Sequence, residues 1–292
     1  MSSEAFQTVI QKHKLEFGVK HDCETPTIPL RSSLANRQDV IALVHLLKHM
    51  KISPDAINRK AWEWVYIIQA LSERGMLSPG KRGLGFAVGS EPLVSFFASN
   101  DVTITATDLD LSNEQTQYWS STNQHVKELS QLLIPEICDI KMFKRNVSFA
   151  PVDMNCIPNT LKGFDFCWSS CAFEHLGSEK NGEAFILNTL NTLKPGGVSV
   201  HTTEFNLTTD KSYQLQGDNP YTTVFGKSFF EGLYNKIVET GGCFAPLDFR
   251  LGNHPDEDYI YNWEGTRNHF KLVLGEVIAT SIGIIIIKGR KN

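Results

Sequence analysis

Several features that would assign this chain of 292 residues to a particular class of protein are missing from it. Its six cysteines form no Cys-x-x-Cys pair, so the spacing typical of structural zinc sites is absent. Several cysteines lie in apolar runs, which predicts reduced, packed thiols, no disulfide framework and a cytoplasmic location. The longest apolar tract, near Val277 to Ile287, is too short for a membrane-spanning helix, so we expect no membrane insertion.

A concentrated charge of one sign is also missing. The chain has 28 Lys and Arg residues against 32 Asp and Glu residues, which gives a formal net charge of −4. No basic block stands out, and nucleic-acid binding needs a concentrated positive surface, so a nucleic acid is not the expected partner. The first residues have neither the basic nor the apolar stretch of an export signal.

The hydrophobic pattern changes near residue 80. Apolar residues recur at helical spacing before this point, for example at Trp62, Val65, Ile68 and Leu71. A breaker cluster over 78–82 follows, and short apolar runs then alternate with longer amphipathic segments. We therefore expect a helical N-terminal extension over 1–80 and one α/β domain over 81–292.

The alternation predicts individual elements of a mostly parallel sheet. Expected strands cover 83–88, 102–107, 147–152, 164–169, 198–203, 243–249 and 279–288. Expected helices begin near Glu91, Asn113, Phe173 and Lys227. The polar stretch 250–272 interrupts the last two strands, which makes it a candidate substrate-facing insertion.

A glycine-rich turn follows the first expected strand. Gly83, Gly85 and Gly89 would let the backbone approach a ligand closely, because a Cβ atom would collide with it. Asp108 ends the next strand 19 residues after Gly89, where an acidic side chain accepts hydrogen bonds from ribose hydroxyls in nucleotide-binding folds. Leu109 would pack against an adenine ring.

Charge separates two kinds of nucleotide cofactor at this turn. Glu91 follows Ser90, an expected helix N-cap, and a carboxylate there would repel the pyrophosphate of a nicotinamide cofactor. The same carboxylate tolerates a cofactor that carries ammonium and sulfonium groups. Glu91 has an alternative interpretation, in which it only complements the helix dipole.

Five segments in this order and spacing resemble class I methyltransferases that use S-adenosylmethionine; they are residues 83–91, 106–110, 151–154, 164–170 and 193–201. The resemblance implies a Rossmann-like fold with a seven-stranded, mostly parallel sheet, helices on both faces and a final antiparallel hairpin. It also implies that Asp153 lies near the adenine amino group, that Met154 packs against the ring, and that the backbone at Ser169 holds the methionine end. S-adenosylhomocysteine would be the product.

Methyl transfer to a hydroxyl requires a group that accepts a proton. His175 follows the fourth strand and His201 ends the fifth, and histidine suits this role near neutral pH. Glu204 would assist His201 only if that strand ends near residue 202, because alternation otherwise places them on opposite faces. His175 has an alternative role in orienting its loop.

Metal ligation is a weaker interpretation of one acidic segment. His254, Asp256 and Asp258 have side chains of the right type, but an exposed acidic loop explains the same residues. We therefore predict no metal.

The combined motifs resemble a bacterial subgroup of small-molecule methyltransferases often associated with glycan or natural-product assembly. We expect methyl transfer to a hydroxyl of a small molecule such as a sugar, a glycan end or a natural product. Its cavity would lie between the insertion and the N-terminal helices, with Trp62, Trp64 and Tyr66 as candidate lining. Three alternatives stay open: an N-methyltransferase, a nicotinamide-dependent oxidoreductase and a noncatalytic scaffold.

Overall fold

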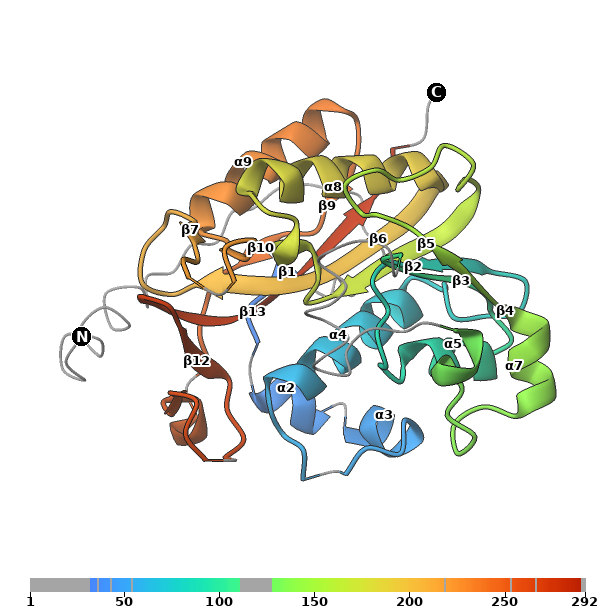
Figure 1. The fold of residues 1–292 in the computed structure, drawn as a ribbon, viewed down its shortest axis with the longest axis horizontal. Helices are drawn as coiled ribbons and strands as arrows, with labels where there is room; N and C mark the ends of the chain where they lie inside the picture. Colours follow the sequence, from blue (N-terminus) through green and yellow to red (C-terminus); the bar gives the residue numbers. More distant parts are fainter. Residues whose placement is uncertain are drawn as a thin grey trace.

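The computed structural model describes residues 32–289 except 36, 43, 54, 111–127, 218, 253 and 266. Within these residues a nine-stranded sheet has helices on both faces (Figure 1). Its strands are β2 (Arg82–Gly85), β3 (Thr103–Asp108), β4 (Val147–Pro151), β5 (Phe164–Ser170), β6 (Leu193–Asn206), β9 (Cys243–Phe244), β11 (Ile260–Tyr261), β12 (Lys271–Leu274) and β13 (Val277–Ile287). Short pairs join β1 (Ser32–Ser33) to β10 (Leu247–Asp248), and β7 (Tyr213–Gln214) to β8 (Thr223–Val224).

The strand order places a switch in direction at the centre of the sheet. Five parallel strands lie in the order β4-β3-β2-β5-β6, so the chain first moves outward from β2 and then crosses to its other side. This is the doubly wound Rossmann order. Strand β13 then pairs antiparallel with β6 and also with β9 and β12. The expected Rossmann-like α/β fold with a final antiparallel strand is confirmed.

Two hydrophobic cores lie on opposite faces of the sheet. The helices on one face are α2 (Arg37–Ala42), α3 (Val44–His49), α4 (Arg59–Glu73), α5 (Leu93–Ser99) and α7 (Ile140–Asn146), and those on the other are α8 (Glu179–Thr192) and α9 (Lys227–Glu239) (Figure 1). Strand β13 is apolar along most of its length and almost wholly buried, as expected for a strand covered on both faces.

Helix α4 is the longest described helix of the N-terminal region, and it packs against the sheet. Asn58 caps it, because its side chain accepts a hydrogen bond from the Ala61 amide at 3.0 Å. Trp62 and Tyr66, one turn apart, stack at 4.7 Å and are buried. Gly283 of β13 leaves room for the Tyr66 ring, so the helix lies close against the sheet.

Several boundaries differ from those expected. Strand β6 begins at Leu193 and continues to Asn206, so the Lys-Pro-Gly-Gly sequence lies within the strand at a register shift rather than in a turn before it. The helix expected near Phe173 is a short 3-10 turn, Phe173–His175, followed by α8. The helix expected near Asn113 and residues 1–31 lie outside the described residues. The domain boundary near residue 80 stays a prediction.

Substituting Gly283 by alanine tests the packing of α4. A Cβ atom there would overlap the Tyr66 ring, so we expect the free energy of unfolding to fall by about 1–3 kcal/mol. Gly232→Ala in α9 is the matched control, because nothing lies within 4 Å of the added atom and alanine favours the helix. Urea denaturation measures both variants. Equal stabilities would contradict close packing of α4 on β13.

Candidate functional site

A cavity of about 400 Å³ opens at the carboxyl ends of β2 to β5, next to the switch in strand order. Open α/β sheets bind ligands at this position, and the volume is typical of small-molecule sites. The lining residues come from α4, from the last residues of β3 and β5, and from the segments after the four strands; they are Lys60, Trp64, Ala87, Gly89, Ser90, Glu91, Asp108, Leu109, Val152, Asp153, Met154, Asn155, Ser170, Cys171, Ala172, His175 and Leu176.

Asp108 anchors the turn that forms one wall of the cavity. Its Oδ2 accepts a hydrogen bond from the Gly89 amide at 3.3 Å, and its Oδ1 accepts one from the Leu109 amide at 2.8 Å. Ala87 and Gly89 both adopt positive φ, 46° and 49°, which folds the turn back over the strand end. The carboxylate is therefore held in place by the backbone that surrounds it.

Gly83 and Gly85 do not belong to this turn. Both lie in β2, where a Cβ atom would collide with Phe166 and Trp168 of the neighbouring strand. Neither lines the cavity. Their part in the expected cofactor turn is therefore corrected: they permit packing between strands, and the turn itself begins at Ala87.

Asp153 and Met154 lie in the segment after β4 and line the cavity. The Oδ1 of Asp153 accepts a hydrogen bond from the Asn155 amide at 2.8 Å, which fixes the loop. Met154 is buried, so its side chain presents an apolar surface beside this carboxylate.

Glu91 lines the cavity but does not lie in a helix. Helix α5 begins at Leu93 with Pro92 in the cap position, so the expected N-cap at Ser90 is wrong. Burial raises the pKa of Glu91 to about 7, although Lys60, whose Nζ lies 3.9 Å away, acts in the opposite direction. This carboxyl group therefore gains or loses its charge near neutral pH.

A buried polar network lies behind the cavity wall and joins α4 to the sheet. Arg59 Nη1 is 3.2 Å from Glu63 and 2.6 Å from Glu204, and Lys60 Nζ is 2.7 Å from Glu63. Burial would raise the pKa of Glu63, but Lys60 and Arg59 outweigh it and hold that pKa below its usual value. Ser281 of β13 also donates to Glu63. We call these five residues the Arg59 network.

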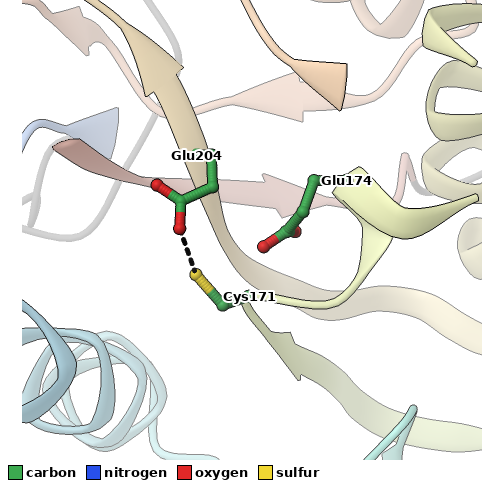
Figure 2. A group of neighbouring side chains, drawn as sticks. All are labelled: Cys171, Glu174 and Glu204. Carbon is green, nitrogen blue, oxygen red and sulfur yellow. Dashed lines mark hydrogen bonds between the residues drawn. The ribbon is translucent and has the colours of Figure 1, made fainter. Parts of the chain in front are cut away.

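Cys171 connects the Arg59 network to the cavity. It follows β5 with a positive φ of 46°, and its thiol donates to Glu63 at 3.1 Å. Glu174 lies beside it (Figure 2), and burial together with Glu204 raises the pKa of Glu174 to about 8. Burial and neighbouring carboxylates also raise the pKa of the Cys171 thiol.

The two predicted histidines lie in different environments. His175 lines the cavity, and its Nδ1 is 2.7 Å from Thr222 Oγ1. His201 is fully buried on the other face of the sheet, between Phe173 and Phe185, and it does not line the cavity. Strand β6 continues well past residue 202, so alternation separates His201 from Glu204.

The two serines that end β5 point to opposite faces of the sheet. Ser169 Oγ is 2.7 Å from His201 Nδ1 and is completely buried, whereas Ser170 faces α4 and lines the cavity. Successive residues of β5 point to opposite faces. Of these two serines, Ser170 is therefore the one whose side chain reaches the cavity, and its hydroxyl donates to Glu63. The expected role of the backbone at Ser169 stays a prediction.

Among the residues that the structure describes, one cluster of potential metal ligands is found, and it consists of Cys171, Glu174 and Glu204. The cysteines also differ from expectation. Cys138, Cys156, Cys167 and Cys171 are free thiols, but Cys243 is disulfide-bonded, so the expectation of reduced cysteines throughout is wrong at that position. Local spacing does not reveal a bond that tertiary folding brings about.

Among the described helices, none has the length and hydrophobicity to cross a membrane.

No family model and no curated protein matches the sequence. Three similar solved structures are a proposed sarcosine dimethylglycine methyltransferase from Galdieria sulphuraria, an S-adenosylmethionine-dependent methyltransferase from Clostridium acetobutylicum, and the glycopeptide N-methyltransferase MtfA. Their identities are 17%, 12% and 10%, and their TM-scores are 0.37, 0.43 and 0.45. In the same order, the alignments cover 55%, 85% and 80% of this chain and 51%, 98% and 98% of the similar chain. This chain therefore spans about half the length of the Galdieria protein. Likeness at this level carries no argument about activity.

The burial of His201 has a measurable consequence for stability. Desolvation lowers the pKa of His201 to about 3, below its value of about 6.5 in an unfolded chain. As pH falls, the unfolded state therefore binds the additional proton before the folded state does. The contribution of His201 to the free energy of unfolding is complete above pH 6.5 and is lost as pH falls from 6.5 towards 3. The expected slope is up to about 1.4 kcal/mol per pH unit.

We expect His201→Gln to lower stability at pH 7.5 and to flatten the decline between pH 6.5 and 4.5. Urea denaturation across this range measures the slope. Because other groups also titrate there, the difference between the variant and the parent protein is the relevant quantity. An identical slope in both would contradict the neutral state of this imidazole.

Proposed function

We propose that this protein is a methyltransferase that uses S-adenosylmethionine and acts on a small molecule. The observation that carries the proposal is the convergence of Asp108, Asp153 with Met154, and Glu91 on one cavity at the strand switch. These residues follow three successive strands of the Rossmann order. Asp108 would bind the ribose hydroxyls, with Leu109 on the adenine face, and Asp153 with Met154 would bind the adenine.

The charge of the cavity supports this cofactor over a dinucleotide. Glu91, Asp108 and Asp153 are acidic, and Lys60 is the only Lys or Arg among the described lining residues. Lys60 is already paired with Glu63 at 2.7 Å. A pyrophosphate would therefore meet carboxylates without a free cation, whereas the ammonium and sulfonium groups of S-adenosylmethionine complement them.

Bound S-adenosylmethionine supplies the sulfonium methyl group, and the protein must align the acceptor and remove its proton. The proposed acceptor is a hydroxyl of a sugar, a glycan end or a natural product. His175 is the predicted base that lines the cavity, and Thr222 fixes its ring through Nδ1. Burial lowers the pKa of His175 to about 3, so the imidazole is neutral at physiological pH, the protonation state from which a proton acceptor starts. The same low pKa makes it a weak base, so the proposal rests on its position at the cavity.

Cofactor binding is tested by calorimetry of the purified protein with S-adenosylmethionine, S-adenosylhomocysteine and NADH. We expect micromolar binding of the two adenosyl compounds, about −8 kcal/mol, and none of NADH. Asp108→Ala should lose most of this affinity, because the ribose partner is removed. Asp210→Ala, which removes one exposed carboxylate elsewhere, is the control. Binding of NADH alone would favour the oxidoreductase, and unchanged binding by Asp108→Ala would contradict the ribose assignment.

The role of His175 is tested by formation of S-adenosylhomocysteine with matched hydroxyl and amine acceptors. We expect His175→Gln to lower kcat about 100-fold or more with a hydroxyl acceptor, with cofactor affinity unchanged. His254→Gln is the control, because His254 is exposed and does not line the cavity. Full turnover by His175→Gln would remove His175 from the mechanism. Turnover of amines alone would favour N-methylation.

A further inference from the structure

Three potential metal-ligating side chains meet behind the cavity wall. Cys171 follows β5, Glu174 lies in the 3-10 turn after it, and Glu204 lies near the end of β6. One ligand atom from each lies within 4.8 Å of the other two. Figure 2 shows these side chains directed toward one shared space.

Each carboxylate in this group has one oxygen that its protein neighbours leave without a partner. Glu174 Oε2 accepts a hydrogen bond from Thr203, and Glu204 Oε1 accepts one from Arg59. Glu174 Oε1 and Glu204 Oε2 are buried and accept no hydrogen bond from any described residue. The two residues are only 1% and 7% exposed, so water does not compensate readily. Buried carboxylate oxygens normally have a partner.

The neighbouring cations do not supply that partner. Arg59 is engaged by Glu63 and Glu204, and Lys60 is engaged by Glu63. Within the described part of the chain, Glu174 has no Lys or Arg within ion-pair distance. The His175 Nε2 atom lies 3.8 Å from Glu174 Oε1, which is beyond hydrogen-bond distance. A cation bound here would give both of these oxygens a partner.

We propose that Cys171, Glu174 and Glu204 form a binding site for a divalent metal ion, with zinc as the preferred ion. A thiolate with two carboxylates suits zinc, whereas calcium and magnesium prefer ligand sets made only of oxygen. As the ion binds, the Cys171 thiol releases its proton to solvent and the sulfur takes the metal in its place, without oxidation or reduction.

The geometry requires a modest closure of the three side chains. Zinc bonds of about 2.0–2.3 Å in a tetrahedron place ligand atoms roughly 3.5 Å apart. Cys171 Sγ and Glu204 Oε1 are already 3.6 Å apart, and every pair lies within 4.8 Å, so the remaining separations shorten by no more than about 1.3 Å. Rotation about the glutamate side-chain bonds covers this distance. Three protein ligands leave one coordination position open, and Cys171 lines the cavity, so the ion would lie at its wall. The site does not depend on the proposed methyl transfer.

The test uses the full chain, stripped of metal with a chelator and titrated with zinc chloride in competition with a chromogenic chelator. We expect one high-affinity ion per chain. Cobalt chloride in a parallel titration should give the near-ultraviolet absorption of a thiolate–cobalt bond. Cys171→Ser should abolish this absorption, and Cys171→Ser and Glu174→Gln should each weaken zinc binding by at least about 100-fold, the upper end of the loss caused by outer-shell changes.

Cys156→Ser is the matched control, since Cys156 is a free, exposed thiol outside the cluster. It should bind zinc and cobalt as the parent protein does. Circular dichroism of the metal-free variants checks that they fold. If Cys171→Ser does not fold, the zinc affinity of Glu174→Gln is the deciding measurement. Three results would each overturn the proposal: unchanged zinc binding by folded Glu174→Gln, loss of the cobalt absorption in Cys156→Ser, or no binding at micromolar zinc. The cluster would then be an extension of the Arg59 network.

Discussion

The charge of Glu63 is the constraint on which the arrangement of the site depends. This carboxylate is fully buried between helix and sheet, where an unpaired charge would be strongly destabilising. Arg59 and Lys60 on its own helix compensate it, and Ser281 and Ser170 donate to it from two different strands. The position of α4 over the sheet is therefore set by hydrogen-bond geometry as well as by apolar packing.

This arrangement also determines what the cavity offers to a ligand. Lys60 and Trp64 of α4 form part of its wall, while Arg59 and Glu63 of the same helix lie behind it. Trp62 and Tyr66 are directed into the core instead. A single helix thus divides its side chains between the cavity, the buried network and the hydrophobic core, which gives the cavity a rigid wall.

The sequence predicts the features that local pattern controls. Strand ends and the position of Asp108 follow from apolar runs bounded by polar residues, whereas the Asp153–Met154 pair was expected from the family resemblance. All three residues line the cavity. Local pattern does not determine which of Ser169 and Ser170 directs its side chain to the cavity, because that depends on the register of β5 in the sheet. Arg59, Glu63 and Glu204 were beyond prediction as a group, because only tertiary folding brings together segments separated by 145 positions in sequence, as for Arg59 and Glu204.

His201 shows the same limit for a single residue. A polar residue at a strand end suggests function, but β6 continues beyond it, and two serine hydroxyls, from Ser169 and Ser199, bond its ring nitrogens. Polar groups that form hydrogen bonds with one another are compatible with the core. Their pattern in the sequence resembles that of a functional site.

The pairing of β13 with β6 has a consequence for the order of folding during synthesis. Ser281, which donates to Glu63, stands opposite Glu204 in this pairing, and β13 is the last strand of the described chain. While the ribosome is still adding these residues, the earlier strands of the sheet are already available to pair. The strand that completes the surroundings of Glu63 and Glu204 is therefore made after every other strand of the described sheet.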